Sequence, residues 1–170
     1  MPRPYRGRAV LVTVLVAVAL VAPAALAAPP QRGVLVPGQS LGGVRIGMTR
    51  AQVKGLWKAD FGRCRDCSRE TWYYNYRPFT PQGAGVIFQS GRVVHVFTIW
   101  QPAGWRTPKG LILGAMEGEV TSLYGPLEER TCLGYTALVM PGRQAQTVFY
   151  VDEGVLWGFG LTRPESSPCV

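Results

Sequence analysis

The sequence is poor in the side chains that most enzymes use for acid–base and metal chemistry. It contains one histidine in 170 residues, and 10 acidic residues stand against 18 basic ones. This leaves little material for histidine-based catalysis or for a histidine–carboxylate metal site. The motifs of a nucleophile elbow, a phosphate-binding loop and a metal-binding helix are also missing. We therefore expect a protein that is not an enzyme, with no catalytic residue, no metal and no cofactor.

The chain also lacks the long unbroken patterns of a helical bundle. Its 21 glycines and 14 prolines are spread along the sequence and indicate many turns. Hydrophobic residues make up 47% of the chain, which is enough for a core and argues against disorder. The length suits one compact domain or two small units.

The N-terminus carries the one long hydrophobic run, in the pattern of an export signal. Three arginines precede an apolar stretch over residues 9–22, and a small-residue site ends at Ala27. The pattern predicts a signal peptide over residues 1–27 and a mature chain that is secreted or lies in the cell envelope. Membrane contact is then confined to the signal before cleavage. An uncleaved anchor is the alternative, since the stretch approaches the roughly 17 residues that span a bilayer.

Internal similarity predicts two copies of one unit. Residues 41–58 match residues 108–125 at an offset of 67, so that Gly47 matches Gly114 and Val53 matches Val120. Residues 86–100 match residues 148–162 at an offset of 63 or 62. Single matches arise by chance, but two blocks in the same order favour repetition. We expect a first unit over residues 28–106 and a second, with a C-terminal tail, over residues 107–170.

Each unit begins with a short helical pattern. Thr49 and Gln52 have the spacing of a capping box, and Val53, Leu56 and Trp57 then lie on one helix face. We expect this stripe to be core. The second unit repeats it, after Met116 in place of Thr49, with Val120, Leu123 and Tyr124.

Extended segments follow each helix. A tight hairpin is expected at Ser90-Gly91, and the turn-rich residues 105–109 are the expected junction between units. The predicted fold class is α+β: two tandem units, each a short helical element packed on an antiparallel three- to four-stranded meander. The expected strands cover residues 71–76, 84–89 and 92–100 in the first unit and residues 135–140, 145–151 and 155–162 in the second.

A short motif in each unit carries a family resemblance. An apolar residue and glycine precede a helix with Gln-Val or Glu-Val, and an aromatic residue follows: Ile46, Gly47, Met48, Thr49, Gln52, Val53 and Trp57, then Leu113, Gly114, Glu119, Val120, Tyr124, Gly125 and Pro126. The pattern resembles the BamE-like family and is similar to the tandem arrangement of the β-lactamase-inhibitor-protein-like fold. This resemblance implies helices packed on one sheet face and an open face used for binding. The chain lacks the lipid-anchored cysteine of the BamE type and any match to a β-lactamase-binding loop.

Four cysteines after an export signal predict two disulfides, for which three pairings are possible. We expect Cys64 to pair with Cys67, its nearest neighbour, and Cys132 with Cys169, which would tether the C-terminal tail. A topology that brings Cys64 close to Cys132 is the alternative. A four-cysteine zinc site is less favoured, because there is one close pair and the compartment is oxidising.

The spacing of Cys64 and Cys67 is also that of a redox motif. Nearby Arg63, Arg65 and Arg69 would lower a thiol pKa, so a thiol-disulfide oxidoreductase is the alternative function. Such a motif normally opens a helix, whereas this one leads into an aromatic strand. A thiol count on the folded protein would separate the two hypotheses.

Charge is divided unequally between the units. Residues 28–106 hold eleven basic and three acidic residues, or +8, and residues 107–170 hold four basic and seven acidic, or −3. The first unit is therefore expected to attract an unknown protein or an anionic envelope component. Ordinary solvation of a charged surface is the alternative. We expect no nucleic acid as a partner, because no binding motif is present.

The aromatic strand at residues 72–76 is the expected binding site. Alternation places Trp72, Tyr74 and Tyr76 on one sheet face, and it groups Trp157 and Phe159 with Leu161 in the last strand. Some of these rings are expected to stay exposed for partner recognition, with core filling as the alternative. The lone His95 is expected to be an ordinary packed or partly exposed imidazole. The binding hypothesis combines Trp72 or Tyr74 with Arg65, Arg69 and Arg77.

Overall fold

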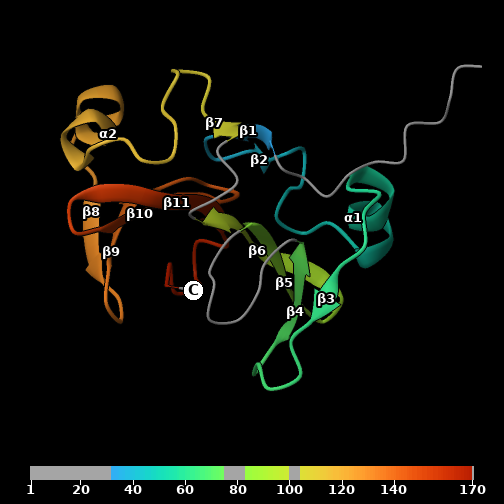
Figure 1. Ribbon diagram of the computed structural model, residues 1–170. Coiled ribbons are helices and arrows are strands. Elements are labelled where there is room, and N and C mark those ends of the chain that lie inside the picture. The colour runs from blue at the N-terminus through green and yellow to red at the C-terminus, as the bar shows by residue number, and fades with distance from the viewer. Residues whose placement is uncertain (1–31, 75–82, 100–103, 170) are drawn as a thin grey trace, which may run out of the picture.

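The computed structural model describes residues 32–74, 83–99 and 104–169, which form a mostly β structure with two sheets and two short helices (Figure 1). The expected signal peptide and its cleavage site lie outside the described residues, as do Tyr76 and Arg77. In the part of the chain that is described, neither helix is long and apolar enough to cross a membrane.

The larger sheet has eight antiparallel strands in the order β3-β4-β5-β6-β11-β10-β9-β8. Strands β6 and β11 pair at its centre, and chain order runs backwards toward both edges (Figure 1). Each half is a meander that the sequence periodicity predicted in part; the short edge strands β3 and β8 were missed. The strands are β3 (Gly62–Arg63), β4 (Glu70–Tyr74), β5 (Gly83–Gln89), β6 (Arg92–Ile99), β8 (Glu128–Thr131), β9 (Thr136–Met140), β10 (Gln146–Asp152) and β11 (Val155–Thr162).

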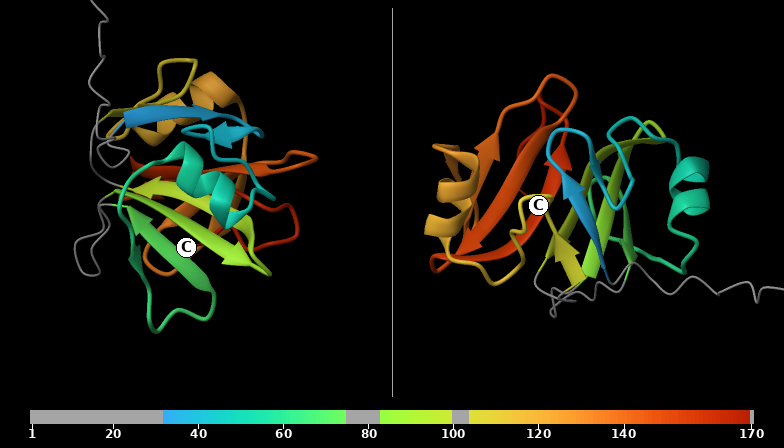
Figure 2. Two further views of the ribbon diagram at one scale, coloured as in Figure 1. Left: turned by 90° about the vertical axis from the view of Figure 1, so that its right-hand side faces the viewer. Right: turned by 90° about the horizontal axis from the view of Figure 1, so that it is seen from above.

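A second, three-stranded sheet lies between the two helices, in the order β2-β1-β7 (Figure 2). Its strands are β1 (Arg32–Val36), β2 (Ser40–Leu41) and β7 (Gly104–Arg106), and β1 pairs with β7 in parallel. The sequence did not predict this sheet. Trp105 belongs to β7 and is buried in the core. The start of the expected junction, residues 105–109, is therefore part of a strand and not only a turn.

Helices α1 (Arg50–Leu56) and α2 (Glu117–Tyr124) each bury one valine completely, Val53 and Val120. The predicted capping box of α1 is confirmed: the Gln52 amide donates to Thr49 Oγ1 at 3.3 Å, and the Thr49 amide donates to Gln52 Oε1 at 2.8 Å. Helix α2 has no side-chain cap at Met116. The predicted core stripe of α1 is wrong at Leu56, which is 47% exposed, because this short helix turns that position away from the sheet.

The main core lies between one face of the large sheet and the layer formed by the helices and the small sheet. Strand side chains alternate, so every second residue enters this core and the next points to the opposite face. A second, smaller apolar cluster covers that opposite face. Sheet residues of the main core include Trp72, Tyr74, Val86, Phe88, Val96, Phe149, Phe159 and Leu161.

Both central hairpins contain a register shift, between Ile87 and Phe88 in β5–β6 and between Tyr150 and Val151 in β10–β11. An extra residue in a strand reverses the face to which its neighbours point. The expected grouping of Trp157 with Phe159 and Leu161 is therefore wrong. Trp157 packs against the second cluster, whereas the other two side chains enter the main core.

The two hairpin turns use left-handed backbone conformations. Ser90 and Gly91 have φ of 49° and 75°, and Glu153 and Gly154 have φ of 48° and 77°. Two consecutive positive φ angles match the right-handed twist of the flanking strands. The predicted tight turn at Ser90-Gly91 is confirmed.

Candidate functional site on the open sheet face

The predicted aromatic site does not lie on the surface. Trp72 and Tyr74 are both completely buried, because their side of β4 faces the helices. Trp72 stacks on Phe61 with ring centroids 4.0 Å apart, and Tyr74 meets Trp57 edge-on at 5.0 Å. Burial raises the pKa of Tyr74 to about 12. The hypothesis that these two rings are exposed for binding is wrong, and the core-filling alternative holds.

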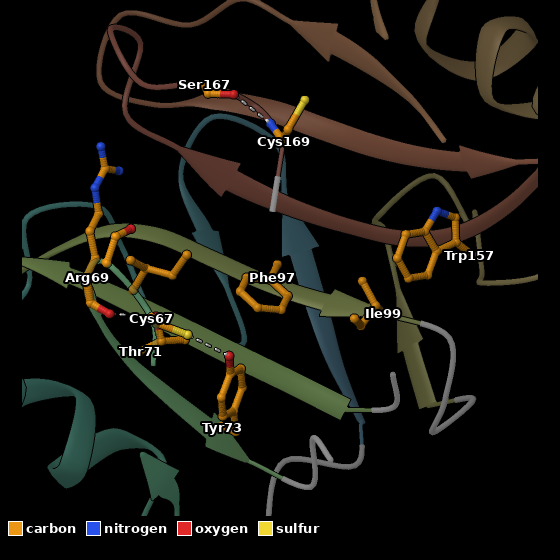
Figure 3. Close-up of a pocket in the computed structure, with 11 residues that line it drawn as sticks. Cys67, Arg69, Thr71, Tyr73, Phe97, Ile99, Trp157, Ser167 and Cys169 are labelled. Atoms are coloured by element: carbon orange, nitrogen blue, oxygen red, sulfur yellow. Dashed lines mark hydrogen bonds between the residues drawn. The ribbon is translucent and has the colours of Figure 1, made fainter. Parts of the chain in front are cut away.

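The opposite face of the sheet carries a hollow of about 470 Å³ (Figure 3). Its lining comes from strands of both halves of the sheet and from two disulfide-bearing segments. Of the predicted binding residues, Arg69 lines the hollow, and Arg65 is exposed on the preceding loop. The lining residues are Cys67, Ser68, Arg69, Thr71, Tyr73, Ile87, Phe97, Ile99, Trp157, Ser167 and Cys169.

The floor of the hollow is apolar and largely aromatic. Tyr73, Phe97 and Trp157 come from β4, β6 and β11, and Ile87 and Ile99 lie between them. Tyr73, Ile87 and Trp157 are only partly buried. Trp157 is also fixed from the side by Tyr135, whose ring it meets edge-on at 5.4 Å. The floor therefore combines accessible apolar area with side chains whose positions are set by packing.

Two disulfides stand on different sides of the hollow. Cys64 pairs with Cys67 in the loop between β3 and β4, and Cys132 pairs with Cys169 at the end of the C-terminal tail. Both predicted pairings are confirmed. In Figure 3, Cys67 and Arg69 lie on one side, and Ser167 and Cys169 lie on the other. Each wall therefore contains a covalent cross-link that restricts its conformational freedom.

Hydrogen bonds hold both walls against the sheet. Tyr73 Oη lies 3.3 Å from Cys67 Sγ in the first wall. In the second wall, Gln146 Nε2 donates to the carbonyl oxygens of Ser166 at 3.1 Å and Arg163 at 3.4 Å. The tail is therefore anchored along its length and at its terminal cysteine.

His95 is buried on this face of the sheet, beside the hollow. Its Nε2 lies 2.7 Å from Tyr150 Oη. This contact links β6 of the first half of the sheet to β10 of the second. Burial, and secondarily the charge of Arg69, lowers the pKa of His95 to about 3. Burial also raises the pKa of Tyr150 well above its ordinary value. Both groups are neutral at physiological pH and form a structural link, in line with the expected packed imidazole.

The remaining chemistry of the described residues is limited. All four cysteines are paired, and the Cys64–Cys67 pair lies in a loop between strands rather than at the start of a helix. Within the described ranges, no three histidine, cysteine or acidic side chains gather where they could hold a metal ion. The described lining of the hollow offers apolar surface, hydroxyl groups and the cationic side chain of Arg69, which suits recognition.

The sequence did not identify Phe97, Ile99 and Trp157 as residues that line the hollow. Alternation along β6 contained the signal for Phe97 and Ile99, since it places both on the side opposite to Val96. The position of Trp157 depends on a register shift that periodicity does not reveal.

No family model matches the chain, and no curated protein matches it. Among solved structures, the chain is similar to an extracellular protein containing a SCP domain from Bacillus anthracis str. Ames, with a TM-score of 0.50 and 12% identity. The match covers 69% of this chain and 44% of that chain, so this chain spans less than half of that protein's length. At this identity the likeness concerns the fold alone.

Proposed function

We propose that this protein is a noncatalytic binding module of the cell envelope or the secreted fraction, and that it recognises a protein partner through the hollow on its open sheet face. The observation that carries this proposal is the partly exposed apolar floor at Tyr73, Ile87 and Trp157, set between two covalently fixed walls. Aromatic anchors in a preorganised recess are typical of the energetically dominant part of a protein interface.

The charge and polarity of the hollow indicate which kind of partner surface would fit it. Among the described lining residues, Arg69 is the one charged side chain, and Ser68, Thr71 and Ser167 add hydroxyl groups. A partner segment that pairs an acidic group with an apolar or aromatic side chain would complement both parts. The acidic group of the partner would pair with Arg69 at the rim, and its apolar group would contact the floor.

Tandem organisation belongs to the same proposal, with units at residues 28–106 and 107–170 and a relation to the BamE-like and β-lactamase-inhibitor-protein-like folds. Equivalent hydrogen bonds support it. Gly47 donates to the Val93 carbonyl at 2.8 Å, and Gly114 donates to the Leu156 carbonyl at 2.7 Å, at the offsets of 67 and 63 that relate the two blocks. The two register shifts are also 63 residues apart.

An extracytoplasmic location is supported by the two disulfides, since such bonds persist mainly in oxidising compartments. The structurally similar protein from Bacillus anthracis is described as extracellular, which agrees with this location. Removal of the signal at Ala27 remains part of the proposal.

The test is capture of a partner from the envelope fraction of the source cells by the purified protein, followed by measurement of its affinity for two variants. Trp157→Ala with Ile87→Ala removes floor area, and we expect at least a 30-fold loss of affinity, the size typical of central interface residues. The matched control is Ile112→Ala, a half-exposed apolar residue that does not line the hollow. Unchanged affinity in the folded double variant would reject the hollow as the binding site.

A further inference from the structure

A row of cations from α1, β3 and β6 lies on the other side of the sheet. Three aromatic rings form a ladder beneath it: Phe61 stacks on Trp72 at 4.0 Å, and Trp72 meets Phe88 at 4.6 Å. Each ring carries a cation above it. Arg50 Cζ lies 5.8 Å from the Phe88 centroid, Lys54 Nζ lies 5.5 Å from both Trp72 and Phe61, and Arg63 Cζ lies 5.8 Å from Phe61.

Arg92 extends this row beyond Arg50. Its backbone bridges to Thr49 at the start of α1, and its Nη1 donates to the Gly47 carbonyl at 3.2 Å. All four cations are exposed. We call Arg92, Arg50, Lys54 and Arg63 the basic ridge.

The ridge has more positive than negative charge. Among the described residues, the carboxylate that forms an ion pair with the ridge is Glu70, which accepts two hydrogen bonds from Arg50 Nε at 2.8 and 2.9 Å and one from Trp72 Nε1 at 3.0 Å. These contacts use both oxygens of Glu70, and the hydrogen bonds from Arg50 are the main reason that its pKa is lowered. Lys54, Arg63 and Arg92 form no ion pair among the described residues. Three positive charges of the ridge therefore have no acidic partner among the described residues.

The ladder also fixes where these charges lie. A cation held over an aromatic face loses less conformational freedom when it binds an anion, so less of the interaction energy is spent on ordering it. The cations follow the order of the rings, with Arg50 at Phe88, Lys54 at Trp72 and Phe61, and Arg63 at Phe61, so they are spread along the ladder rather than gathered around one point. This geometry fits a ligand with repeated negative charges along a chain.

We propose that the basic ridge binds a linear phosphate polymer. A bilayer surface fits less well, because among the described residues Leu56 is the one large exposed apolar side chain on α1, which is too little for insertion. A second copy of this chain fits less well too. Its α2 has Glu117 and Glu119 where α1 has Arg50 and Gln52, but residues 28–170 carry a net charge of +5 (15 basic, 10 acidic), so whole copies repel each other. This proposal does not depend on the hollow, which lies on the opposite sheet face.

The experiment is calorimetric titration of the disulfide-bonded protein with inorganic polyphosphate at low and at moderate salt. We expect binding that weakens as salt increases, because exposed charges are screened. Lys54→Gln with Arg63→Gln should weaken binding about 30-fold, since each cation beside an anionic surface contributes about fivefold. Arg130→Gln with Arg143→Gln removes the same charge from the second half and should change the affinity less than about twofold.

Three further measurements test whether binding depends on the positive charge of the ridge, on the hollow and on a polymeric ligand. Lys54→Arg with Arg63→Lys should retain binding, and Trp157→Ala in the hollow should not affect it. Orthophosphate at equal total phosphate should compete poorly. Equal losses in both Gln double variants, effective competition by orthophosphate, or no binding at low salt would overturn the proposal. Preference for anionic phospholipid vesicles over polyphosphate, or low-salt self-association that depends on the ridge, would overturn it in favour of those occupants.

Discussion

The two halves of the large sheet share a scaffold and differ in what they present to solvent. In each, a short helix with one fully buried valine is followed by four strands with a register shift in the last hairpin. The first half carries the basic ridge over an aromatic ladder, whereas the second presents acidic residues on α2 and β8. Similar buried positions therefore support opposite surface charges, because exposed side chains contribute little to packing.

The halves also use their disulfides differently. The first half closes a short loop, with a sequence separation of 3, and the second ties down the C-terminal tail across a separation of 37. Both bonds nevertheless border the same hollow. Both halves therefore contribute residues to the hollow on the open face, whereas the outer ends of the sheet differ in surface charge.

The largest expected difference between the halves concerns these two bonds. In the loop-entropy account, Cys132→Ser with Cys169→Ser should lower the free energy of unfolding by about 4 kcal/mol, and Cys64→Ser with Cys67→Ser by about 2 kcal/mol. Urea unfolding of both double variants measures the two values. Equal losses would show that loop length does not account for the difference.

A second prediction concerns the link between the halves at His95 and Tyr150. The pKa of His95 is about 3 in the folded protein, below the 6.5 of an exposed histidine, so the unfolded chain binds the proton more strongly. This contribution to stability is complete above pH 6.5 and is lost as pH falls toward 3. Between pH 7 and pH 5 the native protein should lose about 2 kcal/mol more than His95→Gln, which removes the titration. Parallel pH profiles in urea unfolding would contradict the assignment.

The N-terminal caps of the two helices should differ by the least energy of these features. Thr49→Ala removes the capping box of α1 and should cost about 1 kcal/mol. Met116 has φ of −75° and ψ of 150°, an extended conformation like that of Thr49, and Glu119 stands three residues on. Met116→Thr should therefore stabilise the protein by about 0.5–1 kcal/mol. Thermal unfolding of both variants measures these two effects. If Met116→Thr destabilises the protein, the two helices differ in more than their cap residues.

Local patterns predicted much of the fold because they report local physics. Periodicity located both helices and six of the strands of the large sheet, and the cap at Thr49 and the turn at Ser90-Gly91 follow from residue chemistry. Alternation correctly separated Trp72 and Tyr74 from Tyr73. It did not show which of the two faces is covered, because that depends on how the helices and the small sheet pack.

The candidate site was predicted only in part, because its residues are brought together by tertiary packing. Arg69 was identified from its charge and its place beside an aromatic strand, yet Trp72 and Tyr74 proved to be core. Trp157 reaches the open face through a register shift between strands, which no pattern within β11 records. The parallel pairing of β1 with β7 joins segments about 70 residues apart, and loop closure over that distance leaves no local signature.

Sequence patterns alone indicated the helix starts, the tight turns, the division of charge and most of the strand faces, because these depend on neighbouring residues and on composition. It also favoured the disulfide pairing that the structure has, by placing Cys64 beside Cys67 and leaving Cys132 for the tail. Tertiary packing was needed to join β6 with β11 in one sheet, to place both disulfides beside one hollow, and to set Arg50, Lys54 and Arg63 over the rings of Phe88, Trp72 and Phe61. Those outcomes depend on which distant segments pack together, since burial of apolar surface is shared among the whole chain rather than assigned residue by residue.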